Sequence, residues 1–198
     1  ARVDRAIREL HGVRLAPGVD RVYAPGELEQ VTATAYERDN AATGEPVVED
    51  APDGLWSRPP AFQGGGGGLV STADDFLAFG SALLAGGSHH GERVLSRPSV
   101  TLMTSDHLTP AQKAVSGFWP GYFDNTSWAF GMGVRTRRRL LGPSVGSYGC
   151  PGKYGTAWFN DPSEDLTAIF IMQRPHAGDQ RLPMWNDLWT AVYQAIDD

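Results

Sequence analysis

Apolar residues recur at helical spacing in several stretches of the chain, and the clearest of these lies just after residue 70. Ser71 or Thr72 can cap a helix there, an aspartate follows three residues later, and Gly86–Gly87 is expected to end it. The spacing predicts one apolar helix face, made of Phe76, Phe79, Leu83 and Leu84. Further helices are predicted over residues 1–15, from Ser96 onward with Pro98 in the first turn, and over Pro183–Ile196.

From residue 127 onward the pattern changes to the alternation that is typical of strands. One strand is predicted over Trp128–Val134. Three successive antiparallel strands follow over residues 145–150, 153–160 and 165–173, and residues 161–164 form the turn between the last two. Prolines and glycines punctuate residues 16–63, where only Leu28–Tyr36 is predicted to pair as a strand. Helices first, then strands and a closing helix, predict an α+β fold with an antiparallel sheet flanked by helices.

Composition narrows the class of protein. The 198 residues, 41% of them hydrophobic, suffice for one domain with a packed core. Seventeen basic and 23 acidic residues give a net charge of −6, which excludes a generally cationic nucleic-acid binder. A single cysteine excludes a disulfide framework, and the five histidines lack metal-ligand spacing, so no metal or other cofactor is predicted. The longest apolar run, Leu166–Met172, is far below the roughly 20 residues that span a bilayer.

The start of the sequence does not indicate the compartment in which the protein is found. No basic-then-apolar leader is visible, and the chain starts at Ala1 inside a helix-like pattern instead of at a methionine. This favours a processed or truncated polypeptide, so no compartment is predicted. No internal repeat and no domain linker is visible either.

Residues 142–146 read Gly-Pro-Ser-Val-Gly and match the G-x-S-x-G pattern of a nucleophile elbow. Asp161 or Asp165 and then His176 follow Ser144 in the order found in α/β-hydrolases. The elbow needs a helix after the serine, but a strand is predicted here after Ser144. A turn between two strands is therefore the favoured interpretation, and an esterase that uses Ser144 is kept as an alternative.

Two other features carry weaker chemical signals. The run Gly64–Gly68 precedes a helix, where backbone N–H groups attract anions, but the lysine and the serine or threonine of a P-loop are missing. A backbone that passes close to its neighbours is the favoured interpretation. Cys150 has no histidine close in sequence to lower its pKa, so a small buried apolar group is favoured over a nucleophile.

Four stretches are informative as a set: Gly64–Gly87, Val94–Gln112, Trp128–Val134 and Tyr148–Gln173. In this order and spacing they resemble the C-terminal half of the serine β-lactamase-like hydrolases. That group comprises class C β-lactamases, penicillin-binding-protein-like esterases and D-amino-acid peptidases, and the chain is most similar to the family VIII esterases. The resemblance extends over roughly residues 27–198.

The resemblance implies that residues 1–198 are a single C-terminal portion of a β-lactamase/transpeptidase-like fold that lacks its N-terminal segment. Residues 1–126 would form a helical and loop-rich part, and residues 127–198 the antiparallel strands with the C-terminal helix. In the family, an S-x-x-K motif holds the nucleophile and a tyrosine motif the general base, both N-terminal to this region. No serine of this chain has a lysine three residues on. We therefore expect the nucleophile outside the chain, and the chain alone to be inactive.

The family's third motif, K-T-G, H-x-G or W-G-G, aligns with Cys150–Pro151–Gly152, anchored by the shared Tyr154–Gly155–Thr156. The resemblance implies that the amide N–H of Lys153 stabilises the oxyanion of acyl transfer. It also implies that Gly152 lets the strand approach the acyl group. Cys150 and Tyr154 are expected to bind substrate.

Two departures from the family pattern affect the expected substrate. Cys150 stands where lysine, histidine or tryptophan is usual, and Pro151 removes a backbone donor, which strands tolerate at an edge or a bulge. Three positions along a strand would put the Lys153 side chain on the opposite face from Cys150. The departures favour ester or amide hydrolysis over β-lactam recognition.

We therefore expect the C-terminal part of a serine hydrolase that acts on carboxylic esters, amides or β-lactams through an acyl-serine intermediate. The alternatives are a non-catalytic binding module with a degenerate hydrolase fold, and the esterase that uses Ser144. The expected partners are the small-molecule substrate and either the N-terminal remainder of the enzyme or a second copy, which would cover the open sheet edge. Neither a nucleic-acid partner nor a membrane span is expected.

Overall fold

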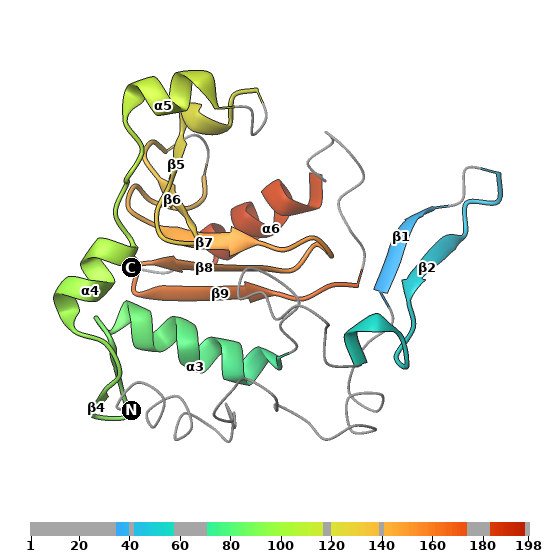
Figure 1. The fold of residues 1–198 in the computed structure, drawn as a ribbon, viewed down its shortest axis with the longest axis horizontal. Helices are drawn as coiled ribbons and strands as arrows, with labels where there is room; N and C mark the ends of the chain where they lie inside the picture. Colours follow the sequence, from blue (N-terminus) through green and yellow to red (C-terminus); the bar gives the residue numbers. More distant parts are fainter. Residues whose placement is uncertain are drawn as a thin grey trace.

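The computed structural model describes residues 35–39, 42–57, 71–116, 120–138, 141–173 and 183–196. The helix predicted over residues 1–15, the glycine run 64–68 and most of the strand predicted over 28–36 lie outside these ranges. Within them the chain forms one five-stranded antiparallel sheet, helices that pack on it and two small hairpins (Figure 1). The predicted α+β class is confirmed.

The main sheet is a meander, in which strands that follow one another in sequence are also neighbours in space. Its order is β5–β6–β7–β8–β9, and every pair is antiparallel. Such a sheet needs no crossover connection, so the predicted succession of strands is sufficient to build it. The strands are β5 (Thr126–Trp128), β6 (Gly133–Arg135), β7 (Tyr148–Pro151), β8 (Ala157–Asp161) and β9 (Leu166–Phe170).

The helices α3 (Ala73–Leu84) and α6 (Pro183–Gln194) pack on opposite faces of the sheet. Successive side chains of β8 point to opposite faces, as in any strand. The ring centroid of Trp158 lies 5.6 Å from that of Phe76 in α3, and the ring centroid of Phe159 lies 5.2 Å from that of Trp189 in α6. The strand β8 is therefore covered on both sides.

The single strand predicted over Trp128–Val134 is wrong, because the chain forms a hairpin there. Strand β5 ends at Trp128 and β6 begins at Gly133. In the turn, the Ala129 N–H donates to the Met132 carbonyl at 2.8 Å, and Gly131 adopts a φ of 78°. In the sequence, Gly131 fits the alternation of large and small residues that is typical of a strand. In the structure, its left-handed backbone forms the turn.

The ends of α3 match the prediction, and its buried face matches in part, because Leu83 is buried and Phe76 packs against the core. The Thr72 hydroxyl accepts a hydrogen bond from the Asp75 N–H at 3.1 Å, and Gly86–Gly87 follow the helix with φ of 66° and 91°. Phe79, predicted to lie on the apolar face, keeps 43% of its surface exposed. Small residues face the sheet because the helix backbone approaches β8 closely. The buried residues of the helix are Ala78, Gly80, Ala82 and Leu83.

This close approach is fixed by the side chain of Asn160 in β8, which is 0% exposed. Its Nδ2 donates to the carbonyl of Gly80 at 2.7 Å and to the Tyr148 hydroxyl at 3.1 Å. Its Oδ1 accepts from Trp158 Nε1 at 3.1 Å and from the Thr167 hydroxyl at 2.9 Å. The amide has two donors and two acceptor positions, and all are used. It ties α3 to β7, β8 and β9.

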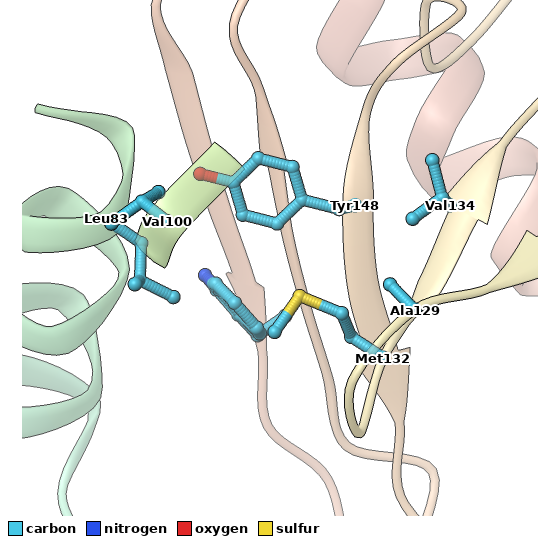
Figure 2. Close-up of a cluster of buried hydrophobic side chains, with 7 residues drawn as sticks. Leu83, Val100, Ala129, Met132, Val134 and Tyr148 are labelled. Carbon is cyan, nitrogen blue, oxygen red and sulfur yellow. The ribbon is translucent and has the colours of Figure 1, made fainter. Parts of the chain in front are cut away.

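The apolar core lies between α3, α4 (Arg97–Met103) and the sheet (Figure 2). Helix α4 begins as predicted, with Ser96 as its cap and Pro98 in the first turn. Tyr148 lies in the middle of the core, between residues of the helices and residues of β6 and the β5–β6 turn. The core residues are Leu83, Val100, Ala129, Met132, Val134, Tyr148 and Trp158.

Several short elements were not predicted. Region 16–63 contains a second strand, which pairs with β1, and a 3₁₀ helix, although only one strand was expected there. Helix α5 carries a sequence signal that was overlooked, a capping box between Thr109 and Gln112. None of the helices in the described ranges combines the length and the apolar character that crossing a membrane demands. The elements are β1 (Ala35–Asp39), β2 (Pro46–Asp50), η1 (Leu55–Ser57), β3 (Ser88–His89), β4 (Glu92–Arg93), α5 (Pro110–Val115) and η2 (Tyr122–Asp124).

Replacing Asn160 by alanine tests the buried amide. The change leaves the Gly80 carbonyl and the Trp158 indole N–H without their partner in the interior, so we expect the free energy of unfolding to fall by about 3 kcal/mol. Thr167→Val removes only one of the four hydrogen bonds and should cost about 1 kcal/mol. Thermal and urea denaturation of the full-length gene product measures both. An Asn160→Ala protein as stable as the wild type would contradict this role.

Replacing Gly80 by alanine has two opposing effects on stability, because it improves helix propensity but crowds the packing against β8. Alanine is favoured over glycine inside a helix by about 1 kcal/mol. A Cβ at this position, however, lies 2.5 Å from Trp158 Nε1, and overpacking of this kind costs about 1–3 kcal/mol. We expect a lower melting temperature for Gly80→Ala, and an unchanged or higher one for the control Ser81→Ala. A Gly80→Ala protein that melts above the wild type would show that the helix does not sit this close to β8.

Candidate active site

The candidate site is the turn that joins β7 to β8, where the sequence placed Gly152, Lys153 and Tyr154. The Gly152 N–H donates to the Thr156 carbonyl at 2.7 Å, and the Gly155 N–H donates to the Gly152 carbonyl at 3.2 Å. Gly155 adopts a φ of 76°. This is the pattern of a three-residue hairpin loop that closes on a left-handed glycine. Lys153 and Tyr154 are therefore the two central residues of a tight turn.

The backbone around Pro151 is open on one side. Strand β6 pairs only with Tyr148 and Gly149 of β7, so Cys150 and Pro151 have no strand on that side in the described residues. Amide directions alternate along a strand, and because the Gly152 N–H points to β8, the nitrogen of Pro151 points away from it. Its missing N–H therefore breaks no hydrogen bond of the sheet. The end of β7 is a local edge, which is where a strand tolerates proline.

The amide N–H of Lys153 is available. Lys153 is exposed, and within the described part of the chain its backbone N–H has no hydrogen-bond acceptor. The donor thus lies at the open end of β7 and is held in a short, hydrogen-bonded loop. Glycine suits position 152, because a Cβ there would collide with the Thr156 hydroxyl unless that side chain moved. The role of the Lys153 N–H in binding an oxyanion stays a prediction.

The side chains of this turn are held by residues about 100 positions earlier in the sequence. The Lys153 ammonium forms an ion pair with Glu49 of β2 and lies 5.1 Å from the centroid of the Tyr154 ring. The Tyr154 hydroxyl accepts a hydrogen bond from Trp56 Nε1 in η1 at 3.1 Å. The hydrogen bond to Glu49 raises the pKa of Lys153, so the ammonium stays charged at neutral pH. Figure 1 shows the β1–β2 hairpin beside this end of the sheet.

The orientation of Trp56 is set by its own segment. Asp50, the last residue of β2, accepts hydrogen bonds from the Leu55 N–H at 2.6 Å and the Trp56 N–H at 3.2 Å. One carboxylate therefore caps the 3₁₀ helix η1 and turns Trp56 toward Tyr154. Neither long-range contact has a signal in the sequence, because nothing local couples residues 49–57 to residues 153–154.

Cys150 shows the properties of a packed thiol. It is half-buried, and burial raises its pKa. Its Sγ contacts the carbonyl of Pro151 at 3.3 Å. A raised pKa keeps the thiol protonated, which disfavours a nucleophile. Strand β7 ends at Pro151, so the predicted placement of the Lys153 side chain opposite Cys150 does not follow from the alternation of side chains along a strand.

Ser144 lies in the connection between β6 and β7, as the favoured interpretation predicted, and no helix follows it. Only 8% of its surface is exposed. Its hydroxyl accepts from Arg138 Nη2 at 2.9 Å and donates to Glu164 Oε1 at 3.3 Å. The Ser144 environment therefore lacks the strand–turn–helix context of a nucleophile elbow. His176 lies outside the described residues.

Asp161, one of the two aspartates considered for the elbow triad, is buried and accepts hydrogen bonds from two structural groups. Its Oδ2 accepts from the Ser144 backbone N–H at 2.8 Å and from the Tyr193 hydroxyl at 2.5 Å. Burial, followed by the hydrogen bond to Asp161, raises the pKa of Tyr193 well above its ordinary value, so the phenol stays protonated and donates. The carboxylate joins the β6–β7 connection to α6, and it contacts the backbone of Ser144 instead of orienting a base.

Two further observations bear on where ligands bind. In the part of the chain that the structure describes, no three histidine, cysteine, aspartate or glutamate side chains gather as a metal site would need. A cleft of about 450 Å³ lies between α3 and the start of β9. Leu166, on its wall, pairs with Asp161, whereas the candidate turn follows Pro151, which pairs with Ala157. The cleft is therefore at the opposite end of β8 from Lys153.

Two proteins of Mycobacterium tuberculosis are similar to this chain in sequence. They are the uncharacterized protein MT1414 of strain CDC 1551 and the protein Rv1367c of strain H37Rv, each 37% identical over 156 residues. The match covers 76% of this chain but 38% of each relative. The chain thus spans about two fifths of the length of the curated relatives that it matches.

Solved structures show the same fold. Simvastatin synthase LovD of Aspergillus terreus, in a mutant form, aligns with a TM-score of 0.64 and 18% identity, covering 85% of this chain and 44% of that one. EstCE1, described as a hydrolase with promiscuous acyltransferase activity, aligns with a TM-score of 0.55 and 24% identity, covering 74% and 39%. A penicillin-binding protein homologue of Caulobacter crescentus aligns with a TM-score of 0.50 and 21% identity, covering 64% and 32%.

The family itself follows from the sequence. The family model described as Beta-lactamase matches residues 20–189, which is most of the chain. This range includes the α3 segment, the strands of the main sheet and the candidate turn. The β-lactamase-like fold predicted from the four stretches is confirmed, and the chain belongs to the Beta-lactamase family.

Proposed function

We propose that the protein is a serine hydrolase that cleaves carboxylic esters, and secondarily amides, through an acyl-serine intermediate. In this proposal the described chain contributes the oxyanion-binding wall, and the nucleophile lies outside these 198 residues. The observation that carries the proposal is the Lys153 amide, the backbone donor of an exposed residue, which has no acceptor in the described residues and lies at the open end of β7. Two solved proteins have a similar fold, one described as a hydrolase with promiscuous acyltransferase activity and one as a synthase. Both descriptions are consistent with acyl transfer.

The chemistry gives the amide its role. A serine hydroxyl attacks the acyl carbonyl, loses its proton to a base, and leaves a tetrahedral intermediate with a negative oxygen. The Lys153 N–H donates to that oxygen, and the intermediate collapses when the alcohol leaves with a proton. Water then attacks the acyl-serine and regenerates the enzyme. A backbone donor fixed in advance stabilises the oxyanion by about 3–4 kcal/mol.

The charge near the turn bears on the substrate class. The Lys153 ammonium is paired with Glu49, so the turn presents a neutral amide donor and not a lone cation. Cys150, protonated and half-buried, offers no cation at the motif's first position. A β-lactam carries a carboxylate that such a cation would bind, whereas an uncharged ester needs none. This supports esters as the first substrate class to test.

A second candidate function is a binding module without catalysis. It is favoured by Cys150 and Pro151, which replace residues that the family motif uses. A module of this kind would keep the fold and the turn but would have no acylated serine.

The donor role can be isolated by comparing two substitutions at one position. Lys153→Ala removes the side chain and keeps the N–H, whereas Lys153→Pro removes both. Proline suits the second position of a β-turn, and Gly152 before it tolerates extended backbone. We expect kcat for p-nitrophenyl butyrate, measured with the full-length gene product, to be about 100- to 1000-fold lower for Lys153→Pro than for Lys153→Ala. Equal kcat values for the two variants, at matched melting temperatures, would overturn the proposal.

Covalent labelling locates the nucleophile. A fluorophosphonate probe reacts with an activated serine, so we expect one labelled serine in the full-length gene product, outside the 198 residues. Peptide mapping identifies the site, and Ser144→Ala should label as strongly as the wild type. Label on Ser144 would contradict this expectation and support the esterase that uses Ser144 as its nucleophile. A full-length protein that takes up no label would favour the binding module.

A further inference from the structure

The Lys153–Tyr154 turn is held from outside the sheet by two adjacent contacts. Glu49 binds the first turn residue, Lys153, and Trp56 binds the second, Tyr154. Both partners come from one short segment, residues 49–57, whose shape is fixed by the Asp50 carboxylate. A two-point attachment restrains rotation of the turn as well as its displacement. The backbone N–H of Lys153 belongs to the peptide unit directly before the first attached residue.

The Glu49 carboxylate depends on Lys153. Its Oε2 is buried and has no hydrogen-bond partner within the described residues, while its Oε1 binds the ammonium. The carboxylate side chain is 23% exposed, whereas that of Lys153 is 63% exposed. A mostly desolvated carboxylate with one cationic partner holds that partner more firmly than a solvated one does. The ion pair therefore attaches the turn to β2, with the less exposed Glu49 carboxylate holding the more exposed Lys153 side chain.

We propose that Glu49 and Trp56 are positioning residues, which hold the Lys153–Tyr154 turn so that the Lys153 N–H is aimed at the oxyanion. The inference rests on the proposed function, because it concerns the same donor. It adds that residues 49–57 tune catalysis without touching the substrate. Effects on the transition state are sensitive to sub-ångström displacement of a donor, so losing one attachment lowers kcat while KM stays the same.

The first test is a double-mutant cycle on the full-length gene product with p-nitrophenyl butyrate. We expect Glu49→Gln and Lys153→Ala each to lower kcat by about 3- to 10-fold with KM unchanged, and the double variant to be no worse than either single one. Raising NaCl from about 0.05 to 1 M should lower kcat of the wild type, because salt screens the pair, and leave the double variant unaffected. Glu45→Gln, which removes a nearby exposed charge, is the matched control and should behave like the wild type.

The second test exchanges the charges and examines the other contact. Glu49→Lys combined with Lys153→Glu should recover most of the kcat lost in Lys153→Ala. Trp56→Phe and Tyr154→Phe each remove one side of the same hydrogen bond, so both should lower kcat by the same factor, and their combination by no more.

The outcomes separate the two proposals. A Glu49→Gln protein with wild-type kcat, or additive losses in the cycle, overturns the positioning role. If Glu49→Gln does not fold, the charge-exchanged protein decides: recovered kcat supports the role, and a kcat at the Lys153→Ala level overturns it. The comparison of Lys153→Pro with Lys153→Ala is independent of Glu49, since both variants lack the ion pair. A large difference in kcat between these two variants, together with a Glu49→Gln protein of wild-type kcat, overturns the positioning role and leaves the donor role of Lys153 in place.

Discussion

The buried amide of Asn160 is the constraint on which the arrangement of the fold depends. A fully buried carboxamide is costly unless all its hydrogen-bonding positions are used. Here the four partners come from α3, β7, β8 and β9, so the amide is satisfied only when these elements are docked together. Gly80 allows the helix to come close enough for its carbonyl to reach the amide. Packing of the core and pairing of the strands therefore specify the same arrangement.

The same constraint reaches the candidate site through strand register. Tyr148 pairs with Asn160, and three residues further along, Pro151 pairs with Ala157. A slip of one residue would turn Trp158 and Asn160 away from α3 and break every contact of the amide. Because the register is fixed, the loop of residues 153–155 has a defined length and Gly155 has a defined backbone. The Lys153 N–H owes its position to this register, and its orientation to the contacts from Glu49 and Trp56.

Local signals in the sequence were sufficient for much of the fold. The Thr72 cap, the glycines after α3 and the turn at residues 161–164 are all short-range features, and each was found. The β5–β6 hairpin was missed because Gly131 mimics an alternating strand. The buried face of α3 was predicted in part: Leu83 is buried and Phe76 packs on the core, but Phe79 stays 43% exposed. Hydrophobic spacing does not identify Ala78, Gly80 and Ala82, which are buried where the helix lies close to β8. The candidate turn came from a resemblance, and its attachment to Glu49 and Trp56 had no local signal, since the partners are separated by 104 and 98 positions.

The most direct measurement is a crystal structure of the full-length gene product with a phosphonate trapped on its nucleophile, because the phosphoryl oxygen mimics the oxyanion. We expect that oxygen to lie about 2.7–3.1 Å from the Lys153 backbone nitrogen, with the N–H pointing at it. A phosphoryl oxygen bound elsewhere, with the Lys153 amide facing solvent or another part of the protein, would contradict the role assigned to this turn.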